Sequence, residues 1–236
     1  MGLRFTTYFF ELPGHGLSSA YPVPFNSRLV PQTVEALVDQ LGYSSFSLMG
    51  FSFGGLLALR TLEHLQSRIQ NVILLSPVVS RRALLYSSRK QWFLQQAVRL
   101  LKQPPAQRTA ARLMRVQSLQ APLIFALSAF TKVDRAILES KDALKIPAST
   151  LDVLSYTLDE ILTIEYRSAR PFSTPCFFGM SVHDDLIEYQ LTEKIIQEHF
   201  SQLKIQKFYH PYHQPPHPPT FEWLVEQFYP FMDLID

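Results

Sequence analysis

The pattern of apolar positions divides most of the chain into strand-like and helix-like segments. Continuous apolar runs predict strands at residues 6–10, 45–50, 71–75, 175–180 and 204–209. Amphipathic runs predict helices at residues 31–41, 53–65, 188–200 and 221–234. Continuous apolar runs indicate strands buried on both faces, and their alternation with helices is typical of a parallel sheet covered by helices. We therefore predict an α/β fold built on a mostly parallel sheet.

The pattern changes between residues 80 and 172. Amphipathic helices are expected at residues 91–101, 108–118 and 151–164, without a strand–helix–strand unit. The apolar run at 121–130 could line an acyl pocket or belong to the interior of this segment. The pattern thus predicts a core formed by residues 1–79 and 173–236, with an inserted helical segment at 80–172.

Ser52 lies where a predicted strand gives way to a predicted helix, within Gly50-Phe51-Ser52-Phe53-Gly54. The pattern G-x-S-x-G in this context is typical of a nucleophile elbow, a sharp turn that strains the serine backbone. Side chains two positions before and after the serine would collide, so we expect Gly50 and Gly54 to be required. The hydroxyl would be exposed at a helix N-terminus, where partial positive charge favours a developing anion.

A second motif lies upstream, where residues 11–18 read Glu-Leu-Pro-Gly-His-Gly-Leu-Ser after the first predicted strand. Together with the elbow, this motif resembles the α/β-hydrolase fold family, whose members commonly carry D-x-x-G-x-G-x-S there. Glu11 replaces the usual aspartate. The resemblance covers nearly the whole chain, and it implies that residues 80–172 form a helical cap and that His15 lies in a structural turn.

The resemblance also implies the chain order serine, carboxylate, histidine for a catalytic triad. The loop after the predicted strand at 175–180 contains Asp184 and Asp185, followed by two aliphatic residues. Asp184 matches the family pattern best, and Asp185 is the alternative. Either carboxylate could instead cap a loop or helix.

The loop after the last predicted strand contains three histidines, His210, His213 and His217. His213, in His-Gln-Pro, resembles the family's catalytic H-x-P best, and His210 and His217 are the alternatives. Three histidines so close together are also compatible with a metal site, but the loop is rich in proline and has no cysteine nearby. We expect no metal there.

The resemblance implies a complete reaction. His213 would take the proton of Ser52, the backbone N–H of Phe53 would donate to the oxyanion, and water would release the acid from an acyl-enzyme. The expected function is a cofactor-free serine hydrolase of carboxylic esters or thioesters that acts on a small acyl substrate. The alternatives are a serine-bearing lyase or carbon–carbon hydrolase, or a relative that binds without turnover.

Charge is distributed unevenly along the 236 residues, although the net charge is only +2. Between Glu63 and Asp134 there is no acidic residue, but there are eleven basic ones: Arg68, Arg81, Arg82, Arg89, Lys90, Arg99, Lys102, Arg108, Arg112, Arg115 and Lys132. This interval could form a solvated face, or one that attracts an anionic substrate or an anionic membrane surface. Aromatic residues are sparse there, so we expect no nucleic-acid binding.

The lengths of the apolar runs, the first residues and the cysteine content indicate where in the cell the protein is expected. No apolar run is long enough to span a membrane, and residues 1–10 do not resemble a signal peptide. Cys176, the single cysteine, cannot form an internal disulfide, which fits a cytoplasmic protein. The oligomeric state is left open.

The start of the chain departs from the family pattern, because no strand with a His-Gly loop precedes Glu11. Such a loop would supply a second oxyanion donor, and its strand would lie between the first predicted strand and the elbow strand. We expect that the natural start lies further upstream. The alternative is that the strand at residues 6–10 moves inward and pairs directly with the elbow strand.

Overall fold

The computed structural model describes residues 6–15, 17–114 and 148–213, and the chain divides into two compact units. We call one the sheet unit; its parts are Met1–Thr6, Asn26–Ser87 and Glu160–Asp236. The other, the helical unit, consists of Thr7–Phe25 and Ser88–Asp159. The predicted boundaries at 80 and 172 differ from these. Isolated bridges from Ser80 to Glu165 and from Leu84 to Ile187 tie both flanks of the predicted insertion to the sheet unit.

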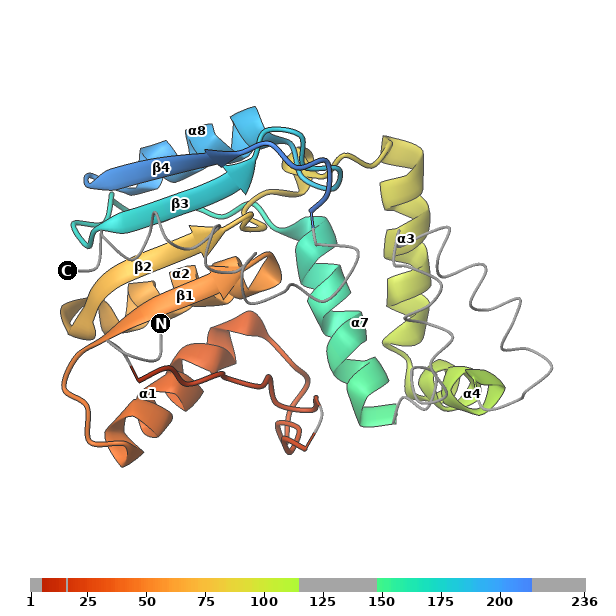
Figure 1. The fold of residues 1–236 in the computed structure, drawn as a ribbon. Helices are drawn as coiled ribbons and strands as arrows, with labels where there is room; N and C mark the ends of the chain where they lie inside the picture. Colours follow the sequence, from red (N-terminus) through yellow and green to blue (C-terminus); the bar gives the residue numbers. More distant parts are fainter. Residues whose placement is uncertain (1–5, 16, 115–147, 214–236) are drawn as a thin grey trace. The chain divides into compact units, whose positions relative to one another are not determined.

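The described residues of the sheet unit form four parallel strands in the order β1-β2-β3-β4 (Figure 1). They are β1 (Phe46–Phe51), β2 (Ile69–Leu75), β3 (Cys176–Ser181) and β4 (Leu203–Phe208). Every residue of β3 is buried, whereas the outer strands β1 and β4 consist of half-buried and exposed positions except for the buried Gly50. The prediction of a mostly parallel α/β sheet is confirmed.

Three α-helices of this unit follow the predicted periodicity: α1 (Val30–Gln40), α2 (Phe53–Leu65) and α8 (Tyr189–His199). Helix α2 contacts β1 and β2, and α8 contacts β3. Both lie behind the strands in Figure 1. The apolar stripe of α2 is fully buried at Leu56, Leu59 and Leu62, so this helix is fixed against the sheet. The helix predicted at residues 221–234 lies outside the described residues.

The strand predicted at residues 6–10 is wrong, because this segment is irregular. Phe9 is 94% exposed, so its side chain gains nothing from burial. A strand is stabilised mainly by backbone pairing with a neighbour, and among the described residues β1 has only β2 as a ladder partner. The alternative in which this segment pairs with the elbow strand is therefore also wrong.

The helical unit contains α3 (Ser88–Leu101), α4 (Pro104–Met114) and most of α7 (Ala148–Thr163). Polar contacts join α7 to α4 and to the turn before it: Lys102 Nζ lies 2.6 Å from Asp159 Oδ2, and Gln107 Nε2 donates to Asp152 Oδ1 at 2.7 Å. Helix α4 begins four residues before the predicted start, since prolines fit the first turn of a helix. The apolar run at 121–130 lies outside the described residues.

Contacts of Gly14 with α7 explain why Thr7–Phe25, the segment before α1, groups with the helical unit. Thr150 Oγ1 donates to the carbonyl of Gly14 at 2.9 Å. Gly14 has a positive φ of 84°, and a Cβ there would lie 2.4 Å from Val153 Cγ2. Within the described part of the chain, no helix is both long and apolar enough to cross a membrane.

Candidate active site

Ser52 occupies the turn between β1 and α2 and has a strained backbone, with φ 53° and ψ −119°. A positive φ is uncommon outside glycine and persists only where surrounding contacts enforce it. The Ser52 N–H donates to the carbonyl of Leu75 at 2.9 Å. Its carbonyl accepts from the N–H groups of Gly55 and Val78, both at 3.0 Å. Strand β2 and the loop after it therefore hold the serine in this conformation.

The glycines around Ser52 have different reasons for being glycine. A Cβ on Gly50 would lie 2.3 Å from the carbonyl oxygen of Gly54, so only hydrogen fits there. A Cβ on Gly54 would meet nothing within 4 Å, so the expectation that crowding requires glycine at this position is wrong. Gly55 is the crowded one, because a Cβ there would lie 2.5 Å from Cβ of Pro77. The sequence signal for it was the doubled glycine after the elbow.

His213 links Ser52 to Asp184 through its two ring nitrogens. The Nε2 atom lies 2.9 Å from Ser52 Oγ, and the Nδ1 atom lies 2.8 Å from Asp184 Oδ2. An ionised carboxylate only accepts hydrogen bonds, so Nδ1–H donates to Asp184. In the neutral imidazole, Nε2 is then the acceptor for the Ser52 hydroxyl. This is the tautomer in which a histidine can remove a serine proton.

Asp184 is buried and held by its own loop. Its Oδ1 atom accepts from the backbone N–H groups of Leu186 at 2.9 Å and Ile187 at 2.8 Å. These donors compensate the carboxylate for its lost hydration and leave Oδ2 directed at His213. The predicted capping role and the predicted contact with histidine therefore occur together, on different oxygens of one side chain.

Asp185, the alternative carboxylate, also contacts His213 but through the backbone. Its Oδ1 atom accepts from the His213 N–H at 2.8 Å. The ring of Phe51 stacks on the imidazole, with centroids 5.1 Å apart and an interplanar angle of 29°. Sequence reasoning missed Phe51, because the variable position before an elbow serine gives no local signal of its partner.

The structure does not bring His210, the first alternative to His213, to Ser52. His210 stacks on Tyr212 with centroids 4.4 Å apart, and its Nδ1 lies 2.8 Å from the Tyr212 carbonyl oxygen. His15 lies in a turn of the helical unit, where its N–H donates to the Leu12 carbonyl. His217 lies outside the described residues.

The backbone N–H of Phe53, the expected oxyanion donor, belongs to the first residue of α2, directly after Ser52. The N-terminus of a helix presents N–H groups and partial positive charge to an anion. The sequence motif and the observed helix start thus give Phe53 a position suited to this role.

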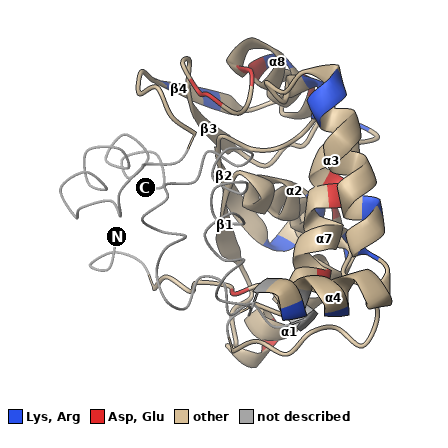
Figure 2. Ribbon diagram, turned by 90° about the vertical axis from the view of Figure 1, so that its right-hand side faces the viewer, with Lys and Arg blue, Asp and Glu red and all other residues tan. Residues whose placement is uncertain are grey.

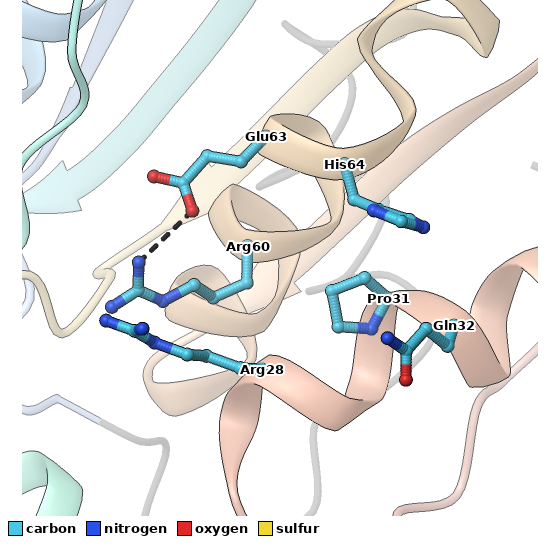
Figure 3. A pocket seen from close by; sticks show the side chains of 6 residues that line it. All are labelled: Arg28, Pro31, Gln32, Arg60, Glu63 and His64. Atoms are coloured by element: carbon cyan, nitrogen blue, oxygen red, sulfur yellow. Dashed lines mark hydrogen bonds and ion pairs between the residues drawn. The ribbon is translucent and has the colours of Figure 1, made fainter.

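A cavity of about 410 Å³ lies elsewhere in the sheet unit and includes none of these residues. The residues that line it come from the turn before α1, from the start of α1 and from α2: Arg28, Pro31, Gln32, Arg60, Glu63 and His64 (Figure 3). Arg60 forms an ion pair with Glu63 at 3.1 Å. Because Ser52 is not among its lining residues, this cavity is not the expected acyl pocket.

Several basic residues of the acid-free interval are neutralised by acidic residues from outside it. Arg68 pairs with Asp39 at 2.7 Å, Lys102 pairs with Asp159 at 2.6 Å, and Arg82 pairs with Glu165 at 3.3 Å. These residues therefore contribute less to a positive surface than the sequence alone suggests.

No group of three or more histidine, cysteine or acidic side chains within residues 6–15, 17–114 and 148–213 is arranged to hold a metal ion. Cys176 is buried in β3, and burial raises the pKa of its thiol far above the ordinary value. The neutral thiol is a poor nucleophile and a poor ligand, so Cys176 is part of the core.

Comparisons with known proteins identify the family of the chain. A model of the alpha/beta hydrolase fold matches residues 2–150. N-formylmaleamate deformylase from Pseudomonas putida is 32% identical over 98 residues, which are 40% of this chain. The chain spans only 36% of the length of that curated relative.

Two solved structures share the fold over nearly the whole chain. A thermophilic esterase from Thermogutta terrifontis has a TM-score of 0.62 at 17% identity, covering 95% of this chain and 78% of the esterase chain. An esterase from Exiguobacterium antarcticum has a TM-score of 0.59 at 14% identity, with coverages of 94% and 76%. At these identities the likeness concerns the fold alone. The family model, in contrast, matches more than half of the sequence independently of the structural likeness. The chain therefore belongs to the alpha/beta hydrolase fold family.

Proposed function

We propose that this protein is a serine hydrolase that cleaves carboxylic esters or thioesters of small molecules through an acyl-enzyme. The observation that carries the proposal is the hydrogen-bonded series Ser52–His213–Asp184, with contacts of 2.9 Å and 2.8 Å. A nucleophile, a base within hydrogen-bonding reach and a group that orients the base are the requirements for activating a serine hydroxyl.

The first half of the reaction begins with neutral His213, whose ring proton is on Nδ1. As Ser52 Oγ attacks the acyl carbon, its proton passes to His213 Nε2. Asp184 stabilises the imidazolium, and the N–H of Phe53 donates to the oxyanion. When the tetrahedral intermediate collapses, the bond to the leaving oxygen or sulfur breaks, and that atom takes the proton from Nε2.

The second half releases the acid. The neutral His213 takes a proton from a water molecule, whose oxygen attacks the acyl carbon of the ester formed with Ser52. The bond between Ser52 Oγ and the acyl carbon then breaks, and Oγ recovers the proton from Nε2. No cofactor enters any of these steps.

A second candidate is hydrolysis of an N-formyl amide, favoured by the similarity of 98 residues to N-formylmaleamate deformylase. The same residues would perform it, with the formyl carbon as the site of attack and an amide nitrogen as the leaving atom. The two candidates differ only in acyl group and leaving group, so a substrate comparison separates them.

The proposal is tested with a fluorophosphonate probe, which forms a covalent bond to an activated serine. We expect labelling of the natural chain, complete loss in Ser52→Ala, and unchanged labelling in Ser47→Ala, a matched control at an exposed serine on β1. Labelling that persists in Ser52→Ala would show a different nucleophile and overturn the proposal. A folded chain that binds ligands but is never labelled would favour a binding role.

The substrate class follows from a panel of aryl esters and thioesters of increasing acyl length, measured beside N-formyl amides. Turnover of esters that disappears in Ser52→Ala supports the first candidate. Exclusive turnover of formyl amides supports the second. Bond cleavage without incorporation of water into the product would instead indicate the lyase alternative.

A further inference from the structure

Helix α3 of the helical unit exposes an apolar face. Positions 89, 92, 93, 96 and 100 follow the spacing that places residues on one side of a helix. On this side Trp92 is 55% exposed, Phe93 61% and Leu100 64%. Val98, on the opposite side, is 3% exposed and anchors the helix to its unit. Three large apolar side chains thus face outward from one helix.

Arginines accompany this face. Arg89 and Arg99 are exposed on α3, and Arg108 and Arg112 are exposed on α4, which contacts α3. Neither helix contains an acidic residue. Figure 2 shows the Lys and Arg positions along both helices. Lys102 pairs with Asp159, so it contributes less positive charge to this surface than the exposed arginines do.

We propose that the α3 face, defined as Arg89, Trp92, Phe93, Arg99 and Leu100, docks on an anionic phospholipid surface. Aromatic and aliphatic side chains would enter the boundary between headgroups and acyl chains, while the arginines would contact lipid phosphates. A 14-residue helix is too short to span the hydrocarbon region, so α3 would lie in the plane of the interface.

The charge pattern selects this occupant. A second copy of the chain would bring the same arginines together and repel at low ionic strength. An interface helix requires an apolar side with cationic residues nearby, and α3 provides both in four turns. The proposal does not depend on the reaction at Ser52, which belongs to the sheet unit.

Intrinsic fluorescence tests the docking directly. The chain has two tryptophans, so the Trp223→Phe variant leaves Trp92 as the single reporter. We expect its emission to shift to shorter wavelength on addition of vesicles of phosphatidylcholine mixed with phosphatidylglycerol, and not with phosphatidylcholine alone. Higher salt should weaken the effect because surface charges are screened. A shift of equal size with neutral vesicles, or none with anionic vesicles, would overturn the proposal.

Cosedimentation with the same vesicles identifies the residues. Phe93→Ala and Leu100→Ala should each lower the partition coefficient at least about fivefold, since each variant loses most of the apolar area that the large side chain would bury in the interface. The double variant Arg89→Gln/Arg99→Gln should lose the preference for anionic lipid. Phe9→Ala is the matched control, because Phe9 is an exposed aromatic residue of the same unit outside α3.

Two further outcomes contradict the proposal. An equal loss in Phe9→Ala would show nonspecific adsorption. A dimer in sedimentation velocity that dissociates in Phe93→Ala, without vesicle binding by the natural chain, would assign the face to a second copy. Ser52→Ala should bind vesicles as the natural chain does, so failure of the proposed hydrolase activity and failure of lipid docking are separately detectable.

Discussion

The backbone N–H of His213 donates to Asp185 at 2.8 Å while the imidazole of the same residue donates to Asp184. Two adjacent carboxylates therefore hold one histidine at two different atoms. The contact with Asp184 fixes the ring, and the contact with Asp185 fixes the chain that carries it. Because the distance from His213 Nε2 to Ser52 Oγ depends on both, we expect Asp185 to act as a positioning residue.

Replacing Asp185 tests this relationship. In Asp185→Ala the His213 N–H loses its acceptor, and we expect kcat to fall about tenfold with little change in KM, because a shift of the base weakens proton transfer. Asp185→Asn keeps an oxygen acceptor and should recover most of the rate. An equal loss in both variants would indicate that charge, rather than the backbone contact, matters.

The same variants have a second readout at Tyr86. Burial, and secondarily the negative charge of Asp185, raise the pKa of Tyr86 above its ordinary value. Removing the charge in Asp185→Asn should therefore lower this pKa, as measured by the ultraviolet absorbance difference of tyrosinate. An unchanged titration would contradict the electrostatic contact between the two residues.

Asp184→Asn should be far more damaging than Asp185→Asn. An asparagine amide can donate to Nδ1, which favours the tautomer with its proton on Nε2, where it cannot accept from Ser52. We expect kcat to drop by about four orders of magnitude, the scale observed when a triad carboxylate is replaced by its amide. The measurement is steady-state hydrolysis with active-site titration. Equal rates for the two variants would refute the assignment of Asp184.

Alanine variants of His213 and His210 should likewise differ in activity. His213→Ala removes the base and should reduce kcat by at least about three orders of magnitude, whereas His210→Ala should retain the rate within about threefold. If His210→Ala lost activity and His213→Ala did not, the assignment of His213 as the base would be wrong. Circular dichroism of each variant controls for folding.

The two glycines that flank the elbow serine should differ in their effect on stability when replaced by alanine. In Gly50→Ala the new methyl group would overlap the Gly54 backbone, and we expect a loss of about 1–3 kcal/mol or more in the free energy of unfolding. Gly54→Ala adds a methyl group in open space and should change it by less than about 1 kcal/mol. Urea denaturation measures both. Equal destabilisation would contradict the crowding derived for Gly50.

Glu160 predicts a pH dependence of stability. Burial raises the pKa of its carboxyl above the ordinary value, although Ser27 donates to both carboxylate oxygens, through its N–H at 3.1 Å and its hydroxyl at 2.9 Å. Just above the ordinary value of about 4.3, the folded state then binds more protons than the unfolded state. By linkage, stability is highest below this range and falls as the pH rises through it.

The Glu160→Gln variant should lack this fall, as measured by thermal unfolding between the ordinary carboxyl pKa and neutral pH. Glu198→Gln, at an exposed carboxyl on α8, is the matched control. A slope that persists in Glu160→Gln, or changes equally in both variants, would refute the assignment to Glu160.

Local sequence patterns located most of the elements because their signals act over a few residues. The periodicity at 53–65 gave the bounds of α2, and the apolar run at 175–180 located β3 to within one residue. The strand expected at residues 6–10 had the same kind of apolar run, but apolar character does not supply a pairing partner. Pairing is a property of the sheet and cannot be read from one segment.

The residues of the candidate site also divide into those with a local sequence signal and those located only by the fold. Ser52 could be identified from the sequence alone, because a strand, a glycine-flanked turn and a helix are all encoded locally. The sequence favoured Asp184 over Asp185 and His213 over His210 and His217 only through a resemblance to the family pattern, since each set lies in a single loop. The tertiary structure was needed to bring His213 to Ser52, which lies 161 positions away in the chain. It also showed that the imidazole of His213 contacts Asp184, whereas the backbone N–H of His213 donates to Asp185. The reason is that hydrogen-bonding distances across a sheet depend on strand order and register, which no local pattern specifies.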